Sequence, residues 1–106
     1  MIGTLRHRVI FEAKTQTSDE GGGFTESWAA LTTVFAAAES ERGDERVDGG
    51  RVVSASRLRL RIRYRDDIAA DLRLVFKSRI YAIDWVADPD GKRHWLDLGC
   101  TESLPS

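Results

Sequence analysis

Five arginines in alternate positions are the residues of this chain best placed to do chemistry. Residues 57–65 read Arg-Leu-Arg-Leu-Arg-Ile-Arg-Tyr-Arg. A guanidinium group is a planar fork that donates paired hydrogen bonds to a carboxylate or a phosphate. The pattern therefore indicates a surface that binds anionic groups. The five residues are Arg57, Arg59, Arg61, Arg63 and Arg65.

The alternation also indicates the element that carries these arginines. Successive side chains of a β-strand point to opposite faces, whereas a helix would distribute the same charges all round. We therefore predict a strand over residues 57–65, with the arginines on one face and the apolar residues on the other. The apolar face consists of Leu58, Leu60, Ile62 and Tyr64.

Other reactive side chains are few. Cys100 is the single cysteine, so it forms no internal disulfide or cysteine zinc cluster, and we interpret it as a small buried hydrophobic residue in a reducing compartment. His7 and His94 lie at opposite ends of the chain, and no phosphate-binding or zinc-protease motif occurs. The aspartates between residues 66 and 90 lack calcium-loop spacing and suit turns. We predict no enzyme activity, no cofactor and no metal site.

Length and composition bound the protein class. The 106 residues suit one domain, 1–106, and a hydrophobic fraction of 42% with 31% charged residues is typical of a soluble globular protein. Residues 1–56 contain six basic and nine acidic side chains, and residues 57–106 contain ten and eight, for a net charge of −1. This balance does not indicate a bulk nucleic-acid binder. No stretch has the length of a signal peptide core or membrane span, so we expect a cytoplasmic protein.

Short extended segments separated by turn residues run along most of the chain. A tight connection at residues 77–78 and the turn sequence Asp-Pro-Asp-Gly at 88–91 separate the last strands, whereas residues 14–23 suggest a polar loop. The sequence predicts an all-β fold, a small β-barrel or sandwich of six to seven strands with one long loop or short helix. The expected strands cover residues 5–12, 24–31, 32–39, 57–65, 72–76, 79–87 and 93–101.

Residues 41–56 form a long connection rich in charge and glycine. Few large apolar residues occur there, and connections of this length in a small domain usually have a function or are disordered. A short helix around Asp44–Val47 is one prediction, because Gly49 and Gly50 would end it. A flexible loop is the other.

The row of arginines allows three interpretations. Cross-strand acids such as Glu39, Asp84 or Asp97 would neutralise part of a solvated sheet face. A basic strand on a small barrel would alternatively bind nucleic acid, although the arginine face has no aromatic residue within the strand for base stacking. In the third interpretation the row pairs with acidic residues of a second copy, and such head-to-tail contacts close into rings. The acidic candidates are Glu39, Glu41, Asp44, Glu45 and Asp48.

The order of several short motifs resembles one known family. The motifs are Ile2-Gly3, Leu5-Arg6-His7-Arg8-Val9, Ser18–Gly23 leading to Glu26-Ser27-Trp28, Val34-Phe35-Ala36-Ala37, Arg61–Arg65, Arg79-Ile80-Tyr81 and Leu96–Cys100. In this layout the chain is similar, nearly end to end, to the phage head–tail joining family, the small adaptor, stopper or head completion proteins. The resemblance implies a small β-barrel or sandwich with a short helix.

The resemblance also implies a function in particle assembly. Its members form a ring, of six or twelve copies, at the head–tail interface of a tailed phage, prophage or gene-transfer particle. The ring joins the portal or adaptor complex to the tail terminator or tail tube, and genomic DNA passes transiently through its channel. This implies a virion protein assembled in the host cytoplasm, without a membrane or cofactor. The alternative is a small β-barrel that binds nucleic acid through the strand Arg57–Arg65.

Candidate functional residues follow from these expectations. The interface set begins with the five arginines. Two strand-end segments, Thr15–Gly23 and Asp88–Arg93, are the candidates for docking, and from them the set takes Asp19, Glu20, Asp90 and Arg93. The resemblance places the connection after the early strands in the channel, where its glycines favour a flexible gate and its acids would repel DNA phosphates. This channel set is Glu41, Arg42, Asp44, Glu45, Asp48 and Arg51.

Overall fold

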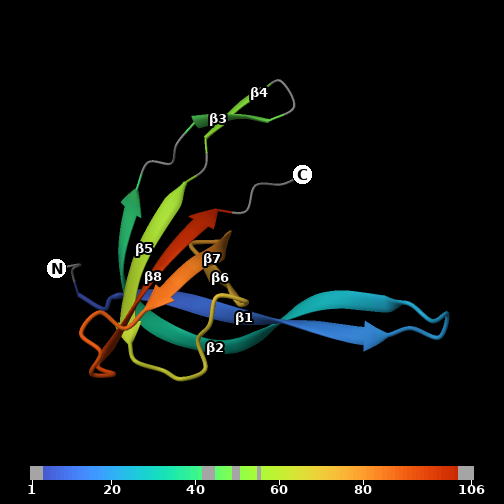
Figure 1. Ribbon diagram of the computed structural model, residues 1–106, viewed down its shortest axis with the longest axis horizontal. Coiled ribbons are helices and arrows are strands. Elements are labelled where there is room, and N and C mark those ends of the chain that lie inside the picture. Colours follow the sequence, from blue (N-terminus) through green and yellow to red (C-terminus); the bar gives the residue numbers. More distant parts are fainter. Residues whose placement is uncertain (1–3, 42–44, 49–50, 55, 103–106) are drawn as a thin grey trace.

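A computed structural model describes residues 4–41, 45–48, 51–54 and 56–102. Six antiparallel strands form a closed barrel in the order β1-β2-β5-β8-β7-β6, and no helix occurs in these ranges (Figure 1). The all-β prediction is confirmed. The barrel strands are β1 (His7–Ser18), β2 (Phe24–Glu41), β5 (Arg57–Arg63), β6 (Arg73–Phe76), β7 (Arg79–Ala87) and β8 (Trp95–Glu102).

The apolar face of the arginine strand supplies the centre of the core. Leu58, Leu60 and Ile62 are fully buried, as the alternation predicts. The strand ends at Arg63, two residues earlier than predicted, and Tyr64 packs half-buried against the edge of the core. Side chains fill the interior, as is usual for a barrel of this size. The other core residues include Val9, Phe11, Ala36, Leu74, Phe76, Tyr81, Ile83, Leu96, Leu98 and Cys100.

Two tight turns fix the register of the second half. Lys77 and Ser78 have φ values of 51° and 64°, the conformation of a two-residue hairpin turn whose twist matches the strands. In the next turn the Gly91 N–H donates to the Asp88 carbonyl at 3.3 Å, with a φ of 69° at Gly91. Both turns were predicted from the sequence. They place β7 between β6 and β8.

The first half of the chain contains a projecting hairpin that the sequence did not predict. Residues 14–18 continue β1 instead of forming a loop, and the two strands predicted at 24–31 and 32–39 are the single strand β2. Beyond the barrel, Lys14 pairs with Trp28 and Ser18 with Phe24. We call residues 14–28 the arm; it extends away from the barrel in Figure 1. Leu31 is an extra residue in the β1–β2 pairing where the arm leaves the barrel.

A separate sheet of two strands stands where the sequence predicted a long loop or short helix. β3 (Glu45–Asp48) pairs with β4 (Arg51–Ser54), with Val47 opposite Val52. The helix prediction is therefore wrong for residues 45–47, and Asp44 lies outside the described residues. Valine favours extended backbone, and a Gly-Gly dipeptide between two such runs is typical of a hairpin connection. This signal outweighs the helical one.

Cys100 gives a direct measure of how well the barrel excludes water. Its thiol is buried, and burial raises its pKa to about 12, against about 8.5 for a free cysteine. At pH 8 we expect a thiol reagent to label the unfolded chain but not the native one. The thiol of the unfolded chain ionises first as the pH rises, so the free energy of unfolding should fall between about pH 9 and pH 12. Rapid labelling of the native protein at pH 8 would contradict this prediction.

Candidate functional site

The central arginine of the row has a partner within the chain. Arg61 lies opposite Asp97 of β8, and its Nε and Nη2 donate to the two carboxylate oxygens at 2.6 and 2.8 Å. The two side chains are only 19% and 14% exposed. The hydrogen bonds to Asp97 raise the pKa of Arg61. Asp97 is one of the cross-strand acids named from the sequence, so the first interpretation is confirmed at this position.

The last two arginines of the row, Arg63 and Arg65, also interact within the chain. The Arg63 guanidinium lies 5.4 Å from the ring centroid of Trp95, its cross-strand neighbour. Arg65 donates two hydrogen bonds of 2.9 Å to Asp67, and this contact lowers the pKa of the Asp67 carboxyl. The contacts of Arg61, Arg63 and Arg65 thus include two carboxylates and one aromatic ring. An interface role for the row stays a prediction.

Two tryptophans lie on the arginine face of the barrel. A bulge between Ile83 and Trp85 turns both Asp84 and Trp85 outward, and the Thr101 hydroxyl donates to Asp84 at 2.6 Å. The Trp85 indole lies directly over Gly99, where a Cβ atom would overlap the ring. The arginine face of this strand has no aromatic residue of its own, as noted from the sequence, but the neighbouring strands supply them. A glycine inside a strand was the available signal, since it often marks a close approach.

Beside Trp85 this face is hollowed by a shallow pocket. Its outer lining includes Arg57, Arg59 and Thr101, together with the bulged pair from β7. In the sheet, Arg57 lies opposite Thr101 and Arg59 opposite Gly99. The first two arginines of the predicted interface row, Arg57 and Arg59, therefore border a surface that also contains a carboxylate and an indole group.

The arm ends in a loop that is organised by Asp19. Its Oδ1 accepts hydrogen bonds from the backbone N–H groups of Gly21 and Gly23, both at 2.9 Å, and Gly22 has a φ of 85°. The Asp19 carboxylate therefore holds the loop, and Glu20 beside it is exposed. Phe24 follows the loop and is 68% exposed. The arm tip thus carries an exposed aromatic ring and an exposed acid, Glu20.

Ion pairs stabilise the arm along its length. Arg73 of β6 donates to Glu12 at 2.6 Å, and its guanidinium lies 4.5 Å from the ring centroid of Trp28. Further out, Lys14 lies 3.1 Å from Glu26. Arg73 thereby connects the base of the arm to a neighbouring barrel strand.

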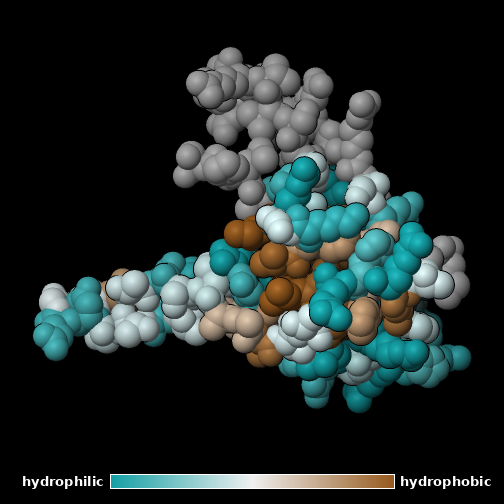
Figure 2. All heavy atoms as spheres, turned by 180° about the vertical axis from the view of Figure 1, so that it is seen from behind, coloured by the Kyte–Doolittle hydropathy of each residue, from teal (hydrophilic) through white to brown (hydrophobic). Residues whose placement is uncertain are grey.

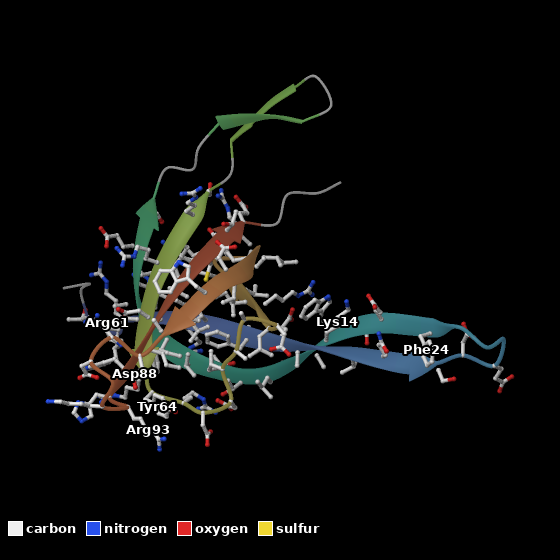
Figure 3. The ribbon with its side chains drawn as sticks, in the orientation of Figure 1. Lys14, Phe24, Arg61, Tyr64, Asp88 and Arg93 are labelled. Carbon is white, nitrogen blue, oxygen red and sulfur yellow. The ribbon has the colours of Figure 1, made fainter. Side chains whose placement is uncertain are left out.

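The second predicted docking segment, residues 88–93, lies far from the arm tip. The Arg93 N–H donates to Asp88 Oδ2 at 3.0 Å, and the Lys92 N–H donates to Asp90 Oδ1 at 2.9 Å, which lowers the pKa of Asp90. Figure 3 shows Arg93 and Asp88 near Tyr64 at one end of the longest axis and Phe24 at the other. The structure therefore separates the two docking segments.

A small apolar cleft lies near Tyr64. Leu5, Val34, Phe35 and Tyr64 line it together with Arg63 and Arg65, and we call it the end cleft. Phe35 is 55% exposed, with the Arg8 guanidinium 5.5 Å from its ring centroid. Sequence reasoning missed this cleft because its residues come from three separate segments. From behind, hydrophobic residues reach the barrel surface, whereas the arm is mostly hydrophilic or neutral (Figure 2).

The predicted channel residues cluster around the β3–β4 hairpin. Glu41 ends β2, Glu45 and Asp48 bound β3, and Arg51 begins β4. Arg42 and Asp44 lie outside the described residues. In Figure 1 the hairpin extends past the ends of β2 and β5. The gating role of this set remains a prediction.

Two searches of the described residues complete the account of possible sites. Among them, no group of three or more histidine, cysteine, aspartate or glutamate side chains is arranged to hold a metal ion. No helix in the same ranges is long and apolar enough to cross a membrane. The features that remain are surfaces: the arginine face, the arm and the end cleft. The described residues therefore form a small closed β-barrel with a projecting arm and several separate surface features.

Comparison with known proteins identifies the family. The sequence profile of the phage head completion proteins matches residues 1–103, and the chain belongs to this family. It is accordingly a structural protein of the phage-type virion. The resemblance inferred from the sequence motifs is confirmed. None of the curated proteins matches the sequence.

Solved structures show the same fold. A chain in the virion of a native gene transfer agent particle superposes with a TM-score of 0.76 at 22% identity, covering 97% of this chain and 99% of that one. A protein from Shigella flexneri 2a, solved in solution, gives a TM-score of 0.73 at 26% identity, with 99% and 98% coverage. Both alignments span nearly the whole of each chain.

Proposed function

We propose that the protein forms a ring at the head–tail interface of a tailed phage, prophage or gene-transfer particle, where it joins the portal complex to the tail. The family match over residues 1–103 carries this proposal. The similarity in fold to a chain from a gene transfer agent virion supports it. The geometry is also suitable, because the arm and the 88–93 turn present different surfaces at opposite ends of one rigid barrel (Figure 3).

A ring of identical subunits requires two different surfaces that fit each other. Contacts of this kind repeat around an axis until they close, and arginine is favoured in them. The arginine face offers Arg59 beside Trp85 on the outside of the barrel. We propose this face as a lateral or docking contact within the particle.

Electron microscopy of the purified protein, alone and with the portal complex of its own particle, tests the ring. We expect rings of uniform copy number on the portal. An Arg59→Ser/Arg63→Ser variant should lose them while remaining folded, as its circular dichroism spectrum would show. Arg61 is left intact in this test because its pair with Asp97 belongs to the folded barrel. A stably folded wild-type protein that never forms rings with its portal would contradict the proposal.

We further propose that the β3–β4 hairpin gates the DNA channel. The hairpin pairs with no other strand in the described ranges, and locally independent elements of this kind open at low cost. Acidic side chains facing the channel would let DNA slide without binding. Neutralising Glu45 and Asp48 together with Glu41 and Asp44 should slow genome release from assembled particles. Faster release would contradict the gate.

One observation favours a second function, the binding of nucleic acid. Trp85 and Trp95 lie among the arginines, and bases stack on such rings beside basic groups. Against this, Asp97 and Asp67 already accept hydrogen bonds from Arg61 and Arg65. Salt-dependent binding of the isolated subunit to DNA, lost in Trp85→Ser, would favour this function over the ring.

A further inference from the structure

We propose that Phe24 at the arm tip of one copy inserts into the end cleft of the next copy. This inference rests on the proposed ring and names the contact between its subunits. The occupant of the end cleft is therefore a second copy of this chain.

The exposure of Phe24 is the first support. A single exposed aromatic ring is common on protein surfaces, so its setting decides whether it matters. Phe24 is 68% exposed on an arm that extends beyond the barrel, and the arm's pairs from Lys14 outward bury no core residue. Two-stranded hairpins are only marginally stable by themselves. An arm that Arg73 anchors in a defined direction is well suited to present one side chain to a partner.

The chemistry of the two ends is complementary. The end cleft has an apolar floor that includes Leu5 and Val34, with Arg63 and Arg65 in its lining. The arm tip presents an apolar ring four residues after the exposed acid Glu20. Burying the ring in the cleft would bring this acid towards Arg63, whose guanidinium lies over the Trp95 ring. Such an arrangement gives both affinity and orientation.

The geometry favours a contact between copies over a contact within one. Phe24 and Tyr64 lie at opposite ends of the longest axis of the molecule (Figure 3). Phe24 therefore cannot reach the cleft of its own chain. The same pair of surfaces in successive copies makes a head-to-tail contact, which is the kind that generates rings.

The acids around the cleft argue against a phosphate backbone as its occupant. Asp67 occupies the Arg65 guanidinium through two hydrogen bonds, and Asp66 next to it is exposed. Asp90 lies in the adjoining turn, 3.5 Å from the His94 ring nitrogen. An aromatic ring accompanied by a single acid suits this surface better than a nucleic-acid strand, in which every phosphate carries a negative charge.

Site-directed cross-linking tests the contact. One sample of the full chain carries Phe24→Cys and another carries Leu5→Cys, and the two are mixed with a short bismaleimide. Cys100 is buried and contributes little background. We expect a heterologous cross-linked dimer, and a ladder of oligomers from a chain carrying both substitutions. Ala82→Cys on the exposed side of β7, away from the residues that line the end cleft, is the matched control. The proposal would be overturned if Phe24→Cys cross-linked to Leu5→Cys no more strongly than to the control. It would also be overturned if cross-links formed only between two Phe24→Cys chains.

A ring assay separates this inference from the function on which it rests. In the portal assay, Phe24→Ser should raise the concentration needed for rings at least tenfold, and Thr25→Ser on the same arm should not. If the Phe24→Ser protein formed rings at the same concentration as the wild type, the arm contact would be overturned and the ring would stand. Absence of wild-type rings with a folded protein would instead overturn the ring. If Phe24→Ser weakened DNA binding but not self-association, the arm tip would bind nucleic acid and the proposal would fail.

Discussion

Replacing Phe11 by alanine should remove a large part of the stability of the barrel. Phe11 is fully buried in β1, opposite Leu74 of β6, where these two strands close the barrel. Removing a buried phenyl ring costs about 3–5 kcal/mol, because apolar contacts are lost and a cavity remains. A domain of this size is stable by roughly 5–15 kcal/mol in total. We expect a large fall in the urea midpoint, or a chain that no longer folds at 37 °C.

The arm supplies a control of identical chemistry. Phe24→Ala removes the same atoms from a ring that is mostly in solvent, so the free energy of unfolding should change by less than about 0.5 kcal/mol. The pair separates folding from assembly, since only the second variant should stay folded while losing contact with its neighbour. Equal destabilisation by the two substitutions would show that the interior is not packed as described.

Breaking the Arg61–Asp97 pair should produce the second large effect. Arg61→Met keeps much of the side chain's volume but leaves a half-buried carboxylate without its two hydrogen bonds. An unsatisfied group of this kind costs about 1–3 kcal/mol. Chemical denaturation of the purified variant measures this difference directly.

Arg65→Met is the matched control for Arg61→Met. It breaks a pair of the same bidentate geometry, but the side chains of Arg65 and Asp67 are 39% and 37% exposed. Water replaces the lost contacts there, so we expect a change of about 0–1 kcal/mol. The double variant Arg61→Met/Asp97→Leu should recover much of the loss, because no charge is then left unpaired. A double variant no more stable than Arg61→Met would show that the damage lies in packing.

Alternating side chains and turn residues were sufficient to predict the strands in the second half of the chain. Strict alternation from Arg57 to Arg63 identified one strand and its buried face. A shift of the strand register by one residue would have exposed every leucine of this strand to solvent. The turn residues at 77–78 and 88–91 correctly separated the last strands. The order of the motifs also indicated the family, which the profile match over residues 1–103 confirms.

The same signals failed where polarity concealed extended structure. Residues 14–18 were interpreted as part of a loop because Thr15 and Thr17 alternate with other polar residues, so no apolar face marks the strand. Nothing on this part of β1 needs burial, and hence the pattern of burial could not reveal it. The pair Val52-Val53 similarly received too little weight against the glycines around it.

The sequence by itself determined an all-β chain, the buried face of its arginine strand, its last two turns and its family. These depend on neighbours a few residues apart, for which side-chain periodicity and backbone preference are sufficient. Only the tertiary structure decided that β6 closes the barrel on β1, that Asp97 pairs with Arg61, that Trp85 covers Gly99 and that three segments build the end cleft. Such contacts join residues far apart in the chain, and their choice depends on closure of the whole sheet.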